Sequence, residues 1–138
     1  MRKIDLIVIH CSATREDRSL TPDDLETMHR RRGFNGTGYH YYIRKDGTVH
    51  LTRPVDRIGA HARGFNAHSI GICYEGGLDC RGCPADTRTP EQRALLIDGC
   101  SIQSYLGYPI INSLSGSQFH SPDFVFTNTG PGTYIIKG

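Results

Sequence analysis

The run Asp5-Leu6-Ile7-Val8-Ile9-His10-Cys11, followed by the small polar residues Ser12-Ala13-Thr14, decides the fold. Aliphatic and β-branched residues bounded by polar turn formers are typical of a buried strand, so we expect a central strand here. His10 then stands where that strand leaves the sheet. Side chains at such strand ends are held rigidly and still reach a crevice, as active-site residues do. Taken alone, the more ordinary interpretation of His10 is a histidine bonded to a neighbouring carbonyl group.

The composition bounds the class of protein. A chain of 138 residues is long enough for one domain with a core and too short for two ordinary ones, so we expect a single domain over residues 1–138. The net charge is only +2, and no basic run or aromatic-interleaved basic patch occurs, so no nucleic-acid partner is suggested. The early apolar run is too short for a signal peptide or a membrane span, which predicts cytoplasmic synthesis and no membrane partner. Five cysteines without a secretory signal favour reduced thiols.

Two helices are predicted from their starting signals. Thr21 is placed as an N-cap before Pro22, and Gly33 is a natural stop after a basic last turn. Thr89-Pro90-Glu91-Gln92 has the spacing of a capping box around a proline at the first helical position. The inner face of this second helix is expected to continue through residues 95, 99, 102 and 106.

Further strands are predicted between these helices. Gly38–Arg44 and Val49–Leu51 are β-prone runs joined through an Asp-Gly pair, which is a strong hairpin signal. Ser69–Tyr74 is expected to be another buried strand. From residue 107 onward only Asp123 and Lys137 are charged, and three apolar patches there, at residues 108–111, 124–126 and 134–136, are candidates for short strands.

Four motifs then occur in a fixed order along the chain. They are Val8–Thr14, Gly38–Gly47, Gly59–Asn66, and Ser69–Ile72 with the glycine pair at 76 and 77. Together they closely resemble the zinc-dependent N-acetylmuramoyl-L-alanine amidases, a family that includes amidase-type phage lysozymes and the peptidoglycan recognition proteins. The resemblance covers residues from about 4 to 98 and is nearer to the phage and bacterial enzymes.

The resemblance implies an α/β fold with a mixed central β-sheet flanked by helices, and a zinc ion in a groove on one sheet face. His10 corresponds to the first zinc ligand, and Tyr39 to the tyrosine that assists catalysis. His40, His61 and Asn66 lie in motifs that line the substrate groove in relatives. The implied reaction is cleavage of peptidoglycan at the amide between N-acetylmuramic acid and L-alanine, by a zinc-activated water, and we expect a monomer that reaches the cell wall after release or export.

The tail departs from the family pattern. His120, in Phe119-His120-Ser121-Pro122-Asp123, is the candidate for the second zinc ligand, but Asn128 stands where a third ligand is expected and no cysteine follows Cys100. Either the tail is divergent, or the residues after about 97 are read in a shifted frame or otherwise unrelated to the family.

Two other functions therefore stay open. The missing third ligand favours a peptidoglycan-binding module with an incomplete, inactive metal site, and a regulatory protein partner rests on resemblance alone. Cys80-Arg81-Gly82-Cys83 has the spacing of half a zinc ribbon, but with no second pair we interpret it as two incidental loop thiols.

Overall fold

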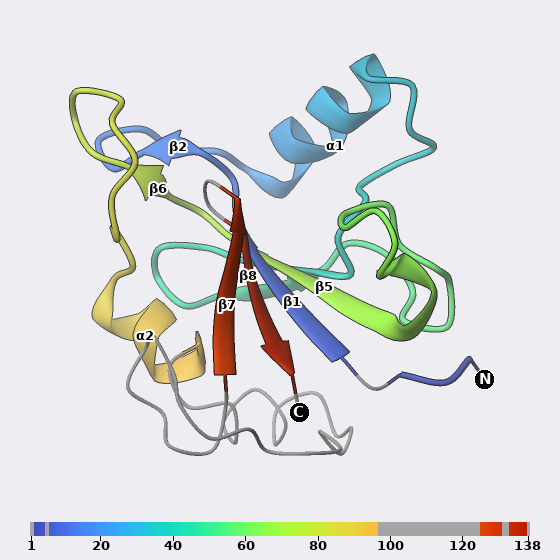
Figure 1. Cartoon of the computed structure of the whole chain (residues 1–138). Helices are drawn as coiled ribbons and strands as arrows, with labels where there is room; N and C mark the ends of the chain where they lie inside the picture. The colour runs from blue at the N-terminus through green and yellow to red at the C-terminus, as the bar shows by residue number, and fades with distance from the viewer. Residues whose placement is uncertain (1, 5, 97–124, 131–132, 138) are drawn as a thin grey trace.

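Strand β1 (Leu6–Cys11) lies inside the main sheet, as its apolar run predicts. It pairs in parallel with β5 (Ser69–Tyr74) on one side and antiparallel with β8 (Thr133–Lys137) on the other. The structure is a computed structural model that describes residues 2–4, 6–96, 125–130 and 133–137 (Figure 1). The sheet order is β4-β3-β5-β1-β8-β7, completed by β3 (Tyr41–Ile43), β4 (Val49–Leu51) and β7 (Val125–Gly130). The expected mixed central sheet is confirmed.

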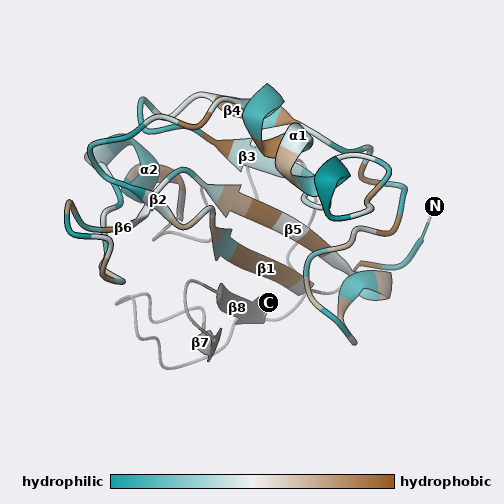
Figure 2. Cartoon of the chain, turned by 90° about the horizontal axis from the view of Figure 1, so that it is seen from above, coloured by the Kyte–Doolittle hydropathy of each residue, from teal (hydrophilic) through white to brown (hydrophobic). Residues whose placement is uncertain are grey.

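One face of this sheet carries an aliphatic core. Ile7 and Ile9 of β1 pack there with Ile70 and Ile72 of β5, and Leu95 from helix α2 (Pro90–Leu96) covers them. Figure 2 shows β1 and β5 as hydrophobic strands in the middle of the molecule. Because successive side chains of a strand point to opposite faces, the residues between these isoleucines face the other way.

The other face combines a small core with the polar residues of the candidate site. Helix α1 (Pro22–Arg31) places Leu25 against Tyr42 and Cys73, and Val8 and His10 point to this same face. Figure 1 shows α1 and α2 on opposite sides of the sheet. The sequence period of β1 thus gives the protein one apolar face and one face that can carry chemistry.

The capping hydrogen bonds of α1 and α2 confirm the predicted starts of both helices. The Thr21 hydroxyl accepts from the Asp24 N–H at 3.1 Å, and the Asp24 carboxylate accepts from the Thr21 N–H at 2.9 Å, which is a capping box. The second capping box joins Thr89 and Gln92 with distances of 3.0 and 3.2 Å. The expected continuation of α2 through residues 99, 102 and 106 lies outside the described residues.

The predicted hairpin is also present, and it is shorter than expected. Strands β3 and β4 pair antiparallel, and Gly47 takes a φ of +86° in the turn between them. Residues 125–126 and 134–136 of the apolar patches fall on β7 and β8, whereas residue 124 and the patch at 108–111 lie outside the described residues. A two-stranded sheet of β2 (Thr14–Arg15) and β6 (Gly77–Leu78) was not expected.

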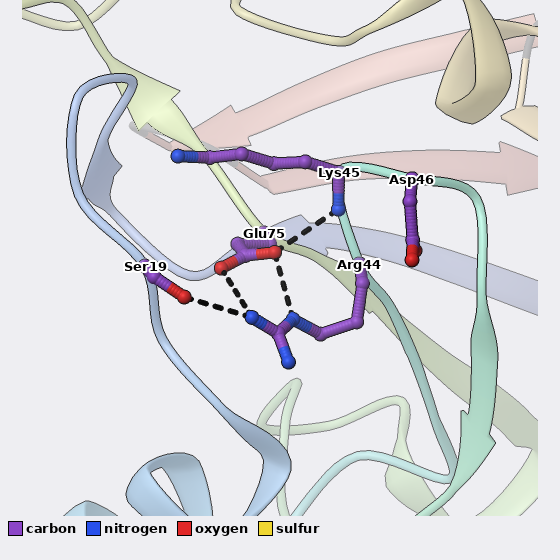
Figure 3. A pocket seen from close by; sticks show the side chains of 5 residues that line it. All are labelled: Ser19, Arg44, Lys45, Asp46 and Glu75. Atoms are coloured by element: carbon purple, nitrogen blue, oxygen red, sulfur yellow. Dashed lines mark hydrogen bonds and ion pairs between the residues drawn. The ribbon is translucent and has the colours of Figure 1, made fainter.

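A buried carboxylate ties the loop before α1 to the ends of β3 and β5 (Figure 3). Glu75 is 1% exposed and accepts from Arg44 Nε at 2.8 Å, from the Lys45 N–H at 3.0 Å and from the Leu20 N–H at 2.7 Å. Arg44 also donates to the Ser19 hydroxyl at 2.8 Å. Burial alone would raise the pKa of Glu75, but the bonds from Arg44 and the two N–H groups outweigh burial and lower it. A cavity of about 230 Å³ beside these hydrogen bonds is lined by Ser19, Arg44, Lys45, Asp46 and Glu75.

Among the helices of the described residues, none combines the length and the apolar character that a membrane crossing requires.

Candidate functional site

Two histidines from distant parts of the chain meet on the α1 face of the sheet. His10, near the end of β1, is 4% exposed, and its Nε2 lies 2.9 Å from Nδ1 of His61. His61 comes from the loop before the short 3-10 helix η1 (Asn66–His68), and its own Nε2 lies 3.3 Å from the Ser69 hydroxyl. The His10 and His61 rings meet edge to face, with centroids 5.0 Å apart. A hydrogen-bonded row of two imidazoles and a hydroxyl therefore crosses from β1 to the start of β5.

A glycine in β5 makes this contact fit. A Cβ atom at Gly71 would lie 2.5 to 2.7 Å from three atoms of the His61 ring, which is closer than real Cβ contacts. The missing side chain lets His61 lie flat against the sheet. The Gly71 carbonyl also accepts from the His40 N–H at 2.9 Å, and this bond joins β5 to the residue before β3.

Both imidazoles of this pair are neutral at neutral pH. Burial lowers the pKa of His10 to about 4. Burial, followed by the neighbouring His10, lowers the pKa of His61 to about 2. The neutral imidazole is the form that accepts a hydrogen bond or binds a metal ion.

Tyr39, the candidate catalytic tyrosine, stands beside His10. Its ring centroid is 5.0 Å from that of His10, and the half-buried side chain packs against the Leu25, Tyr42 and Cys73 cluster. Burial, followed by the neighbouring Cys73, raises the pKa of the Tyr39 hydroxyl well above its ordinary value. Tyr39 is therefore a neutral hydrogen-bond donor and not a base.

His40, expected in the substrate groove, is fully buried. Its Nδ1 accepts from the Gly71 N–H at 3.0 Å, which leaves the proton on Nε2 to donate to the Arg57 carbonyl at 2.7 Å. Burial lowers the pKa of His40 to about 4. A direct substrate contact by His40 would require this pairing with the backbone to open.

Asn66 holds the loop that carries His61. Its side-chain carbonyl accepts from the His61 N–H at 3.0 Å and from the Ala62 N–H at 2.9 Å. Asn66 is partly exposed, so it also has surface toward solvent. The loop is thereby fixed where the sequence shows only an irregular stretch.

The described residues fit a zinc ion only in part. His10 and His61 supply neutral imidazoles, which are suitable ligands, but a zinc site needs about three protein ligands. Over residues 2–4, 6–96, 125–130 and 133–137, no three His, Cys, Asp or Glu side chains form a group that could hold a metal. His120, the expected second ligand, lies outside these ranges.

Sequence reasoning missed His29 as a member of this site. His29 is 3% exposed on α1, and its ring centroid is 5.2 Å from that of Tyr39. Its spacing of four residues from Leu25 placed it on the inner helix face, which was the available signal. Ser69 and Gly71 stood in a predicted strand and in the Ser69–Ile72 motif, but neither was predicted as a site residue.

Comparison with known proteins decides the family. The family model described as N-acetylmuramoyl-L-alanine amidase matches residues 1–120. The chain belongs to this family. An endolysin of Enterobacteria phage K11 is 39% identical over 88 residues, which cover 64% of this chain and 58% of the endolysin. An endolysin of Klebsiella phage KP32 is 38% identical over 96 residues, which cover 67% of this chain and 64% of the endolysin.

A solved structure agrees with this family. The endolysin amidase LysCS from Clostridium intestinale URNW superposes with a TM-score of 0.62 at 34% identity, covering 78% of this chain and 66% of that one. The chain spans 58 to 64% of the length of the two phage endolysins.

Proposed function

We propose that this chain is a peptidoglycan amidase that hydrolyses the amide between the lactyl group of N-acetylmuramic acid and L-alanine. The observation that carries the proposal is the cluster of His10, His61 and Tyr39 on one sheet face of a chain that belongs to the amidase family. The phage relatives named as endolysins, and the Clostridium structure named as an amidase, support the same reaction. Action on the cell wall after release or export is part of the proposal.

We further propose that the reaction depends on zinc. His10 is the first ligand, His120 stays the proposed second ligand, and the third is not assigned. When bound, zinc acidifies a water molecule and polarises the scissile carbonyl. Metal-bound histidines commonly use their other ring nitrogen to bond a neighbour, and the 2.9 Å contact of His10 with His61 is of that kind.

Tyr39 is the proposed catalytic donor. Because its hydroxyl stays protonated, it can donate a hydrogen bond to the negative oxygen that develops as the amide carbonyl is attacked. Burial of the surrounding side chains strengthens such a bond. His40, His61 and Asn66 stay proposed groove residues. His61 and Asn66 are partly buried, whereas His40 is fully buried and its Nδ1 accepts from the Gly71 N–H.

The test measures release of soluble peptide from purified peptidoglycan, with zinc added and then with a chelator. We expect release that the chelator abolishes, a loss to background in His10→Ala, and a loss of about 10²-fold in Tyr39→Phe with retained binding to cell walls. His50→Leu, a histidine change on β4, is the matched control and should keep wild-type rates. Binding to cell walls without any release, at all zinc concentrations, would favour the binding module instead.

A further inference from the structure

His29 connects helix α1 to the backbone that carries Tyr39. It lies one turn after Leu25 on the buried face of α1, and its Nδ1 accepts from the Gly38 N–H at 2.8 Å in a fully buried bond. Gly38 directly precedes Tyr39 in the chain. With Nδ1 as the acceptor, the proton of the neutral ring sits on Nε2. Burial, followed by the charges of Arg32 and Arg53, lowers the pKa of His29 and favours this neutral form.

The His29 ring also supports the Tyr39 ring directly. Their centroids are 5.2 Å apart at an angle of 52°, and Phe34 packs on His29 edge to face at the same distance. Tyr39 in turn contacts the His10 ring at 5.0 Å. Displacing His29 therefore removes a wall of the space that holds Tyr39 beside His10.

Gly38 is fixed on its second side as well. Its carbonyl accepts from the Ala60 N–H at 3.0 Å, and a Cβ atom at Gly38 would lie 2.2 Å from the Ala60 carbonyl oxygen. Ala60 precedes His61, so the Gly38 backbone lies between helix α1 and the His61 loop. The Tyr39 carbonyl is held by the Thr52 hydroxyl at 2.7 Å. Within this set of bonds, His29 is the side chain that fixes the Gly38 N–H.

We propose that His29 is a positioning residue for Tyr39, acting through the Gly38 N–H and through ring packing. The proposal rests on the proposed function, in which Tyr39 donates a hydrogen bond to the reacting amide. His29 touches neither substrate nor the reacting atoms. Its loss should therefore weaken the transition state more than substrate binding, because a misplaced donor costs rate even when the substrate still binds.

Three variants separate this role from a general packing role. His29→Leu keeps the size of the side chain and removes the hydrogen-bond acceptor. His29→Asn places an amide oxygen close to the position of Nδ1. His50→Leu, the same substitution on the edge strand β4, is the control. Steady-state rates on a soluble muropeptide should show kcat lowered about 10- to 100-fold in His29→Leu, with KM changed by less than about threefold. His29→Asn should recover most of that loss, and His50→Leu should match wild type.

A double-variant cycle with Tyr39→Phe tests whether His29 acts through Tyr39. If it does, adding His29→Leu to Tyr39→Phe costs little further rate, because the group being positioned is already gone. Equal losses in the two backgrounds would overturn the proposal. So would a folded His29→Asn that is no better than His29→Leu.

Amide hydrogen exchange provides a readout that does not need amidase activity. The Gly38 N–H should be protected in wild type and in His29→Asn, and should exchange about tenfold faster or more in His29→Leu, with the β5 amides unchanged. If the three proteins show these exchange rates but wild type releases no peptide, the proposed function fails and the positioning of Tyr39 by His29 stands. If Gly38 exchange is the same in all variants, the positioning role fails whatever the activity.

Discussion

Replacing Gly71 by alanine should push His61 off the sheet and disrupt its contact with His10. The new Cβ would lie 2.5 Å from His61 Cδ2, whereas ordinary contact begins near 3.4 Å, so the ring must retreat by about 0.9 Å, the difference between these distances. The loop cannot move that far and keep both the 2.9 Å bond to His10 and the two bonds that Asn66 makes to its backbone. We expect an unfolding free energy lower by about 1 to 3 kcal/mol, as for other overpacked sites, and amidase activity lower by about 10- to 100-fold.

The assay is a double-variant cycle in urea, with His61→Ala as the second change. His61→Ala removes the ring that the new methyl group meets, so Gly71→Ala should cost almost nothing in that background. Replacing a glycine whose backbone suits alanine even stabilises a protein by about 0.4 to 1 kcal/mol. A cost of Gly71→Ala that is the same with and without the His61 ring would refute the reasoning, because the clash would then lie elsewhere.

Three other predictions concern stability. Since the pKa of Glu75 is lowered in the folded protein, its stabilisation is present above the ordinary value of 4.5 and is lost as pH falls through the lowered pKa of the folded state. Glu75→Gln should lower the unfolding free energy by about 2 kcal/mol at neutral pH and flatten its pH dependence below 4.5, and an unchanged slope would contradict this. Thr21→Ala should cost about 1 kcal/mol through the lost N-cap, whereas Thr27→Ala, an exposed mid-helix change, should be neutral or stabilising; equal costs by thermal melting would rule out the cap as the cause. Asn66→Ala should speed amide exchange of His61 about tenfold or more, and unaltered exchange would mean that the loop is held by other contacts.

Local signals in the sequence predicted the elements that position His10. The apolar run at residues 6–11 predicted β1, and threonine-proline pairs predicted the starts of α1 and α2, because an apolar run and a helix cap are recognised from residues close together in the sequence. The Asp-Gly pair gave the β3–β4 turn for the same reason. The resemblance named Tyr39 as a candidate catalytic residue, and its ring lies 5.0 Å from that of His10. Its catalytic role stays a prediction.

The partners of His10 depend on long-range geometry and could not be predicted in the same way. His61 reaches His10 only because the loop bonds of Asn66 and the missing side chain of Gly71 place its ring, and neither leaves a periodic pattern. The burial of Glu75 could not be predicted from its neighbours in the sequence, because it depends on an ion pair with Arg44 at the end of another strand. The zinc ligands expected beyond residue 96 stay predictions, because His120 lies outside the described residues.

The two strands that pair with β1, β5 and β8, are synthesised at very different times. Its parallel partner begins at Ser69, and its antiparallel partner Thr133–Lys137 is synthesised more than a hundred residues after His10. Contacts of such sequence separation form slowly, and until β8 arrives β1 has an unpaired edge that can add a strand from another chain. Nascent chains stalled before β8 should therefore be held by chaperones or aggregate. The strand that carries His10 is thus also the strand whose unpaired edge makes the growing chain prone to misassembly.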